Sequence, residues 1–230
     1  MCGRFNVTST PGLQELLDSL GVAVQLPPPR FNIAPTENIP LLRNRGETGV
    51  ELDQARWWLT PHWAKELSQK YAMFNARSEG LKKSPAFRKP FASQRGIIPM
   101  SAFIEWRGKA GEKQPWLITT EDQSIAAAAL WDLWWGGEGD EPLLSCTMVT
   151  TEAAESFKPW HSRMPVMLQA EDHERWLDNG TTIPDDDPVF RPSLAQPLVL
   201  VPVGKGVGNA RNKDGALMDP VGEVVTLPKG

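Results

Sequence analysis

Cys2 is the residue of this sequence best suited to covalent chemistry. It follows Met1, and because it is small we expect an aminopeptidase to remove Met1 and leave a cysteine at the N-terminus. Such a cysteine has an amine of pKa about 7.7 to 8.0 and a thiol of pKa about 8.5 on adjacent carbons. The amine can form an imine with an aldehyde, and the thiol can close on the same carbon to give a thiazolidine. The alternative is a structural cysteine buried in the first strand.

Three other polar residues lie among apolar or aromatic neighbours. Glu105 stands in the strand-like run 102–106, where partial burial raises a carboxyl pKa and suits general acid–base catalysis. Its alternative position is the exposed face of an alternating strand. His161 follows Trp160 and can donate a proton near neutral pH, or it is a half-buried structural histidine. Asn75 can aim an amide donor at an oxyanion or hydroxyl, or it begins a helical turn.

The composition narrows the possible functions. The 230 residues have a formal net charge of -4, which argues against a protein that coats nucleic acid non-specifically. The two cysteines, Cys2 and Cys146, lack metal-binding spacing, so we expect no disulfide framework, no metal and no cofactor. No signal peptide or membrane span is recognisable, so we expect a soluble, cytoplasmic protein that does not contact membranes. We also expect it to be a monomer. Ten tryptophans against one tyrosine provide faces that fill cores or stack on bases.

Short strand-like runs separated by turns dominate the pattern and predict an α+β fold. We expect one domain over residues 1–230, built on a curled, mostly antiparallel β-sheet or open barrel with a few flanking helices. One helix should begin after the N-cap Thr10 and end at Gly21, and another should cover 171–177. Prolines 27–29 break any regular element, and 30–36 is an ordered loop or a short extended piece. The predicted strands are 3–7, 39–43, 50–59, 96–99, 102–106, 115–119, 125–130, 143–149 and 198–203.

Three polar stretches are interpreted as surface. The glycine-rich segment 136–140 is typical of a solvated hairpin tip. His173 lies in the charged helix 171–177, and the acidic run 185–187 lies between prolines, so we expect both to be exposed.

These polar residues lie in a set of short motifs at 1–5, 31–36, 75–79, 98–99 with 103–106, 149–150, 161–165 and 207–209. The set resembles the SRAP family (SOS response-associated peptidase, also called abasic site processing proteins). The resemblance covers nearly the whole chain. In this family an exposed cysteine attacks the ring-opened aldehyde of an abasic site in single-stranded DNA and forms a stable thiazolidine crosslink that shields the lesion.

The resemblance implies four catalytic roles. Cys2 would be the nucleophile, and Asn75 would hydrogen-bond the sugar or the thiazolidine. Glu105 would handle the amine and imine protons and assist reversal of the crosslink, and His161 would donate a proton to the opening sugar ring.

The resemblance also implies a DNA-binding surface for single strands with abasic sites and for single-strand/double-strand junctions, with the protein on the nucleoid when DNA is bound. Arginines suit phosphates because the guanidinium makes two parallel charge-assisted bonds. Pro40 would wedge at a duplex junction, or it is a proline at a strand start. The other expected contacts are Arg4, Arg77 and Arg163 for phosphates, Thr150 nearby, and Trp58 and Trp106 for stacking.

Three functions therefore follow from the sequence. The first is a DNA–protein crosslinking enzyme with lyase-like activity. The second is an N-terminal cysteine peptidase or amidohydrolase, in which Cys2 attacks a carbonyl with its own amine as base, and whose peptidase activity is either general or limited to the release of Met1. The third is a non-catalytic reader of modified DNA.

Overall fold

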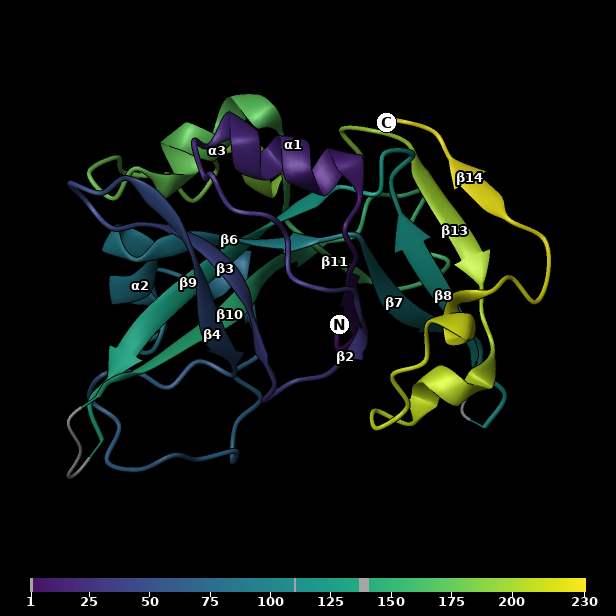
Figure 1. Ribbon diagram of the computed structural model, residues 1–230, viewed down its shortest axis with the longest axis horizontal. Coiled ribbons are helices and arrows are strands. Elements are labelled where there is room, and N and C mark those ends of the chain that lie inside the picture. The colour runs from purple at the N-terminus through teal and green to yellow at the C-terminus, as the bar shows by residue number, and fades with distance from the viewer. Residues whose placement is uncertain (1, 110, 137–140) are drawn as a thin grey trace.

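The computed structural model describes residues 2–109, 111–136 and 141–230. Figure 1 shows the strands as two sheets that lie beside each other, with the N-terminus between them. Most of the predicted hairpin tip, at 137–140, lies outside the described residues, as does Met1. Within the described ranges no helix has the length and apolar character needed to cross a membrane.

The first sheet contains the strand that follows Cys2. In the described part of the chain all its pairings are antiparallel. Its strand order is β14 (Val225–Leu227), β13 (Leu198–Pro202), β8 (Gln114–Thr119), β7 (Ala102–Arg107), β1 (Phe5–Val7) and β2 (Arg30–Ile33).

The second sheet curls until β9 pairs with β10, so that five of its described strands close into a barrel. Most pairings are antiparallel, and β10 pairs in parallel with β4 and β5. The order is β11 (Arg163–Pro165), β10 (Leu143–Glu152), β4 (Val50–Trp57), β3 (Asn38–Asn44), β6 (Arg95–Met100), β9 (Ile125–Trp134) and β12 (Met167–Leu168), with β5 (Asn75–Arg77) on β10. The expected α+β class with a mostly antiparallel, barrel-like sheet is confirmed.

Three α-helices of the described chain pack against β6 of the barrel, and α1 and α3 lie along one edge of it (Figure 1). The Thr10 side chain caps α1 by accepting from the Leu13 N–H at 3.3 Å, as the sequence predicts. The helices are α1 (Pro11–Ser19), α2 (Arg88–Ser93) and α3 (Ala170–Leu177), and single 3-10 turns occur at η1 (Ser78–Gly80), η2 (Pro188–Phe190), η3 (Lys205–Gly208) and η4 (Gly215–Met218).

Aromatic packing joins the two sheets where β1 meets the barrel. Phe5 of β1 and Trp57 of β4 are both fully buried, and their ring centroids lie 4.9 Å apart in an edge-to-face arrangement. Burial of such side chains contributes roughly 1.5 to 3 kcal/mol each. Since Phe5 is only three residues from Cys2, this contact fixes the N-terminal segment against the barrel.

The segment 30–36 contains a short extended piece, β2, followed by a turn. Asn32 has a left-handed φ of 51°, a conformation that asparagine tolerates better than most residues. Its buried amide donates to the carbonyls of Asn209 and Asn212, each at 3.0 Å, and its backbone N–H donates to Asn6 Oδ1 at 2.8 Å. Two of the motifs that carry the family resemblance, 31–36 and 207–209, therefore have a structural role, because they are hydrogen-bonded to each other.

Two surface predictions are wrong. His173 is only 7% exposed, because it lies on the inward face of α3. Asp187 is buried as well, since its carboxylate pairs with Arg175 at 2.6 Å and accepts from the Val189 N–H at 3.1 Å to begin η2. Its neighbours Asp185 and Asp186 are exposed, as predicted.

Candidate functional site

Cys2 lies at the junction of the two sheets. It is 1% exposed, and its thiol donates to the Arg4 carbonyl at 3.6 Å. Asn75, at the start of β5 beside the barrel strand β10, donates from its amide nitrogen to the Cys2 carbonyl at 2.8 Å. This bond ties the segment that precedes β1 to the second sheet. Asn75 begins a strand and not a helical turn, because β5 pairs with β10 at Met148.

Glu105 is the buried carboxyl of the site, 3% exposed on β7. Burial raises its pKa to about 7, partly offset by the positive charge of Lys113. The same carboxylate lies close enough to Cys2 that its charge adds to burial in raising the pKa of the thiol. Because a carboxyl of pKa about 7 exchanges its proton at neutral pH, Glu105 can act as both acid and base. The exposed-face alternative for Glu105 is excluded by this burial.

Substitution of Glu105 by glutamine should change how stability depends on pH. The folded pKa of about 7 lies above the ordinary value of 4.5, so the folded state holds the extra proton between these values. The wild-type protein therefore loses stability as pH rises through 7, and a glutamine cannot ionise. We expect the free energy of unfolding to fall from pH 5 to pH 8 by on the order of 2 kcal/mol more in wild type than in Glu105→Gln. Urea unfolding at both pH values measures this difference.

The matched control for that experiment is Glu47→Gln, since Glu47 is exposed in the β3–β4 turn. It should leave the pH dependence of wild type in place. A Glu105→Gln protein whose stability changes with pH as much as that of wild type would contradict the assignment of a raised pKa to this carboxyl.

His161 is half-buried beside the site and its ring is held by the backbone of Arg163. Its Nδ1 accepts from the Arg163 N–H at 2.9 Å and lies 3.0 Å from the Arg163 carbonyl. Burial lowers the pKa of His161, and the charges of Lys113 and Arg163 lower it further. At neutral pH the ring is therefore mostly uncharged, and both contacts of Nδ1 are with the Arg163 backbone. Nε2 is thus the atom that can donate a hydrogen bond to a bound sugar.

Arg163 is paired within the protein. Its guanidinium binds Glu79 through two bonds, of 2.6 and 3.0 Å, and donates to the Thr150 carbonyl at 2.6 Å. Thr150 is fully buried and lies opposite Arg77 in the β5–β10 ladder. These contacts make Arg163 and Thr150 a support for the His161 ring, and a phosphate would have to displace Glu79 to reach the Arg163 guanidinium.

The other two arginines of the predicted surface differ in exposure. Arg77 ends β5 and is exposed, so its guanidinium is available to a phosphate. Arg4 is half-buried and donates to the Gly3 carbonyl at 3.0 Å, and burial lowers its pKa in spite of the nearby charge of Glu37. Both lie within two residues of Cys2 or Asn75 along the chain.

Three residues predicted to touch DNA are buried or half-buried within the protein. Trp58 is 9% exposed, with its indole N–H bonded to the Ser68 carbonyl and its ring packed on Phe74. Pro40 is buried inside β3 and not at a strand start. Trp106 is half-buried on the face of β7 that packs against Val203, and successive strand residues point to opposite faces, so it faces away from Glu105.

Other residues beside the site escaped the sequence-based prediction. Trp116 lies directly opposite Glu105 in the β7–β8 ladder and shares its face. Its ring makes an edge-to-face contact with Trp160 at 5.8 Å, and Arg107 lies 4.8 Å over the Trp160 ring. Arg107 and Lys113 are exposed cations at the end of this hairpin. A β7–β8 hairpin predicted from the sequence would have revealed that a tryptophan lies opposite Glu105.

The fold and the site define an α+β protein in which a cysteine at position 2 meets an amide and a buried carboxyl between two sheets. A family model described as SOS response associated peptidase (SRAP) matches residues 1–210 of this chain. The chain belongs to the SRAP family.

Relatives and solved structures cover nearly the whole chain. The abasic site processing protein YoaM of Bacillus subtilis is 37% identical over 227 residues, covering 95% of this chain and 98% of that protein. The abasic site processing protein YoqW of the same organism is 38% identical over 203 residues, covering 86% and 87%. A solved protein structure from Bacteroides thetaiotaomicron shares the fold, with a TM-score of 0.70 at 19% identity and coverage of 94% and 99%.

Proposed function

We propose that this protein processes abasic sites in single-stranded DNA by forming a thiazolidine crosslink through Cys2. The observation that carries the proposal is the position of Cys2. Its carbonyl accepts a hydrogen bond from the Asn75 amide at 2.8 Å, and its thiol lies close enough to the buried Glu105 for the carboxylate charge to raise the thiol pKa. The names of the relatives YoaM and YoqW, both abasic site processing proteins, support the same substrate. The resulting crosslink shields the lesion from strand cleavage.

The reaction begins at the sugar. The closed abasic sugar is a hemiacetal, and ring opening moves a proton from the C1′ hydroxyl to the ring oxygen. His161 Nε2 donates to that oxygen, and the Asn75 amide, already directed at Cys2, binds a sugar hydroxyl. Ring opening exposes the aldehyde beside the N-terminal residue.

The amine of Cys2 reacts before the thiol. Removal of Met1 creates this amine, which adds to the aldehyde carbon, and loss of water gives an imine. Burial and Glu105 raise the pKa of the thiol, so Sγ adds to the imine carbon as a neutral thiol that passes its proton to a base. Glu105, with a pKa of about 7, accepts that proton and returns it to the ring nitrogen. The sum is aldehyde plus aminothiol giving thiazolidine plus water.

Exposed cations beside this site would bind the phosphates of the DNA. Arg77, Arg107 and Lys113 are the residues that we assign to phosphate contacts, with Arg4 beside them. The DNA that we assign to these few contacts is a single strand or its junction with duplex, bound by one copy of the protein. Since each lysine or arginine contact releases counterions, binding should weaken with salt.

The testing experiment uses protein whose N-terminus is confirmed as Cys2 by mass spectrometry. It is mixed with an oligonucleotide that contains one abasic site and analysed on a denaturing gel. We expect a shifted covalent band that is absent when the DNA is reduced with borohydride beforehand, because reduction removes the aldehyde. No band from processed, folded protein would overturn the proposal. An acyl-enzyme burst with a peptide would then favour the peptidase of the family description, and DNA binding alone would favour a reader.

A further inference from the structure

The region after β5 has a charge opposite to that of the protein as a whole. No aspartate or glutamate lies between Glu79 and Glu105, whereas that stretch contains five lysines and arginines. The formal net charge of the whole chain is -4. A local concentration of positive charge on an acidic protein attracts polyanions to that place and not to the rest of the surface.

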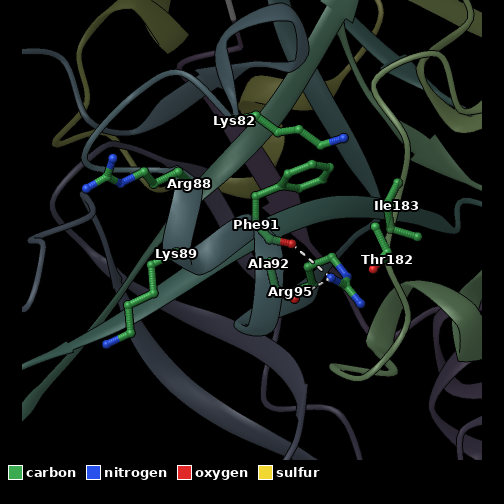
Figure 2. A pocket seen from close by; sticks show the side chains of 8 residues that line it. All are labelled: Lys82, Arg88, Lys89, Phe91, Ala92, Arg95, Thr182 and Ile183. Atoms are coloured by element: carbon green, nitrogen blue, oxygen red, sulfur yellow. Dashed lines mark hydrogen bonds between the residues drawn. The ribbon is translucent and has the colours of Figure 1, made fainter.

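A cavity of about 360 Å³ lies inside this basic region (Figure 2). Phe91, Ala92 and Ile183 form its apolar wall. The cations around it are Lys82, Arg88, Lys89 and Arg95, and we call the first three the basic rim.

Arg95 is not part of the basic rim, because it is not available to bind a ligand. Its guanidinium is fully buried and donates to five backbone carbonyls, those of Phe91, Ala92, Trp176, Asp178 and Thr181. These bonds use all the donors of the side chain. Arg95 therefore forms the floor of the cavity and leaves ligand binding to the rim.

The geometry of the rim fits a chain of phosphates better than one small anion. Figure 2 shows Lys82 on one side of the Phe91 ring, while Arg88 and Lys89 project outward from α2 on another side. Charges that diverge in this way cannot close on a single phosphate. A strand with a phosphate at every nucleotide can contact them one after another.

The rim is also close to the candidate site along the chain. Arg77 ends β5, the single turn η1 follows, and Lys82 comes only five residues after Arg77. Five residues span at most roughly 17 Å, and less where a 3-10 turn shortens them. A few nucleotides bridge that distance, so a strand held at Arg77 can continue to the rim.

We propose that the basic rim binds the phosphates of the DNA strand that flanks the abasic site, several nucleotides from the lesion. This inference rests on the proposed function for the identity of the DNA. The rim adds affinity and takes no part in the covalent chemistry at Cys2. Lys82 pairs with Asp185 at 3.3 Å, so Arg88 and Lys89, which have no ion pair within the described chain, are the main contacts.

The test compares the double variant Arg88→Gln/Lys89→Gln with wild type. Binding to a single-stranded oligonucleotide of 16 nucleotides without an abasic site is followed by fluorescence anisotropy from 50 to 200 mM salt. Loss of two phosphate contacts should reduce the salt slope by about 1.4. For the 16-mer, the weakening over this fourfold salt range should then be about sevenfold smaller than in wild type.

The matched control is Arg191→Gln/Lys229→Gln, which removes the same charge from exposed residues near the C-terminus. Its salt slope should equal that of wild type, and all three proteins should have the same unfolding temperature. A wild-type slope in the rim variant, or an equal loss in the control, would overturn the inference. Failure of the proposed function is a separate result, namely the absence of a crosslink from wild-type protein to a 16-mer with an abasic site.

Discussion

Substitution of Cys2 by alanine is expected to abolish the stable covalent product while the protein continues to form a reversible imine. Alanine is small, so Met1 is still removed and the N-terminal amine remains. Without Sγ the imine carbon cannot close to a thiazolidine, and water reverses the adduct. On a denaturing gel, Cys2→Ala should show no band by itself and a clear band when borohydride is present during the reaction, since borohydride reduces the imine.

Cys146→Ala is the control for this experiment. Cys146 is, like Cys2, a fully buried cysteine with no disulfide, and it lies on β10 away from an amine. It should form the same crosslink as wild type. A second control is protein with its N-terminus blocked by acetylation, which should form no crosslink because the amine cannot attack. A stable band from Cys2→Ala without borohydride would show that another nucleophile forms the product.

The sequence predicts the elements whose signals are local. Helix α1 has a capping threonine, a proline at its first position and a terminal glycine, and these determine its ends without help from the rest of the protein. The β3–β4 hairpin is predicted because two extended runs flank a turn that contains Gly46 and Gly49, and its register from Asn38–Arg56 to Asn44–Val50 is regular. Most of the other predicted strands are present with ends shifted by a few residues.

Elements that depend on tertiary partners are absent from the prediction. The three residues of β5 form a strand only because β10 lies beside them. Helix α2 is six residues long with a proline inside it, and it has no side-chain cap. Its carbonyls are satisfied by Arg95, which comes after the helix and is buried by other elements. No local pattern contains that information.

For the site, residue chemistry is easier to predict than exposure. The chemical types of Cys2, Asn75, Glu105 and His161 are apparent in the sequence, and the structure places Asn75 and Glu105 near Cys2. The burial of Trp58 could not be predicted, because it depends on a fold-specific contact with Phe74. Likewise the Glu79–Arg163 pair joins residues 84 positions apart.

Arg95→Met is the substitution expected to destabilise the fold most. The Arg95 side chain ends two helices at once, because it donates to the carbonyls of Phe91 and Ala92 in α2 and to that of Trp176 in α3. Helix C-termini leave carbonyls without intrahelical partners, and a cation there is favourable. Methionine fills a similar volume but leaves these acceptors without donors in a buried place. Because each such group costs about 1 to 3 kcal/mol, we expect a loss of about 3 to 5 kcal/mol.

Urea unfolding measures this loss, with Arg95→Lys and Arg191→Met as comparison variants. Lysine keeps the charge but has three donors in place of the arginine's five, so Arg95→Lys should lie between wild type and Arg95→Met. Arg191 is exposed, and Arg191→Met should change stability by less than about 0.5 kcal/mol. If Arg95→Met is too unstable to purify, the intermediate stability of Arg95→Lys still tests the idea. An Arg95→Met protein within about 1 kcal/mol of wild type would mean that water satisfies these carbonyls and that the buried guanidinium is dispensable for the fold.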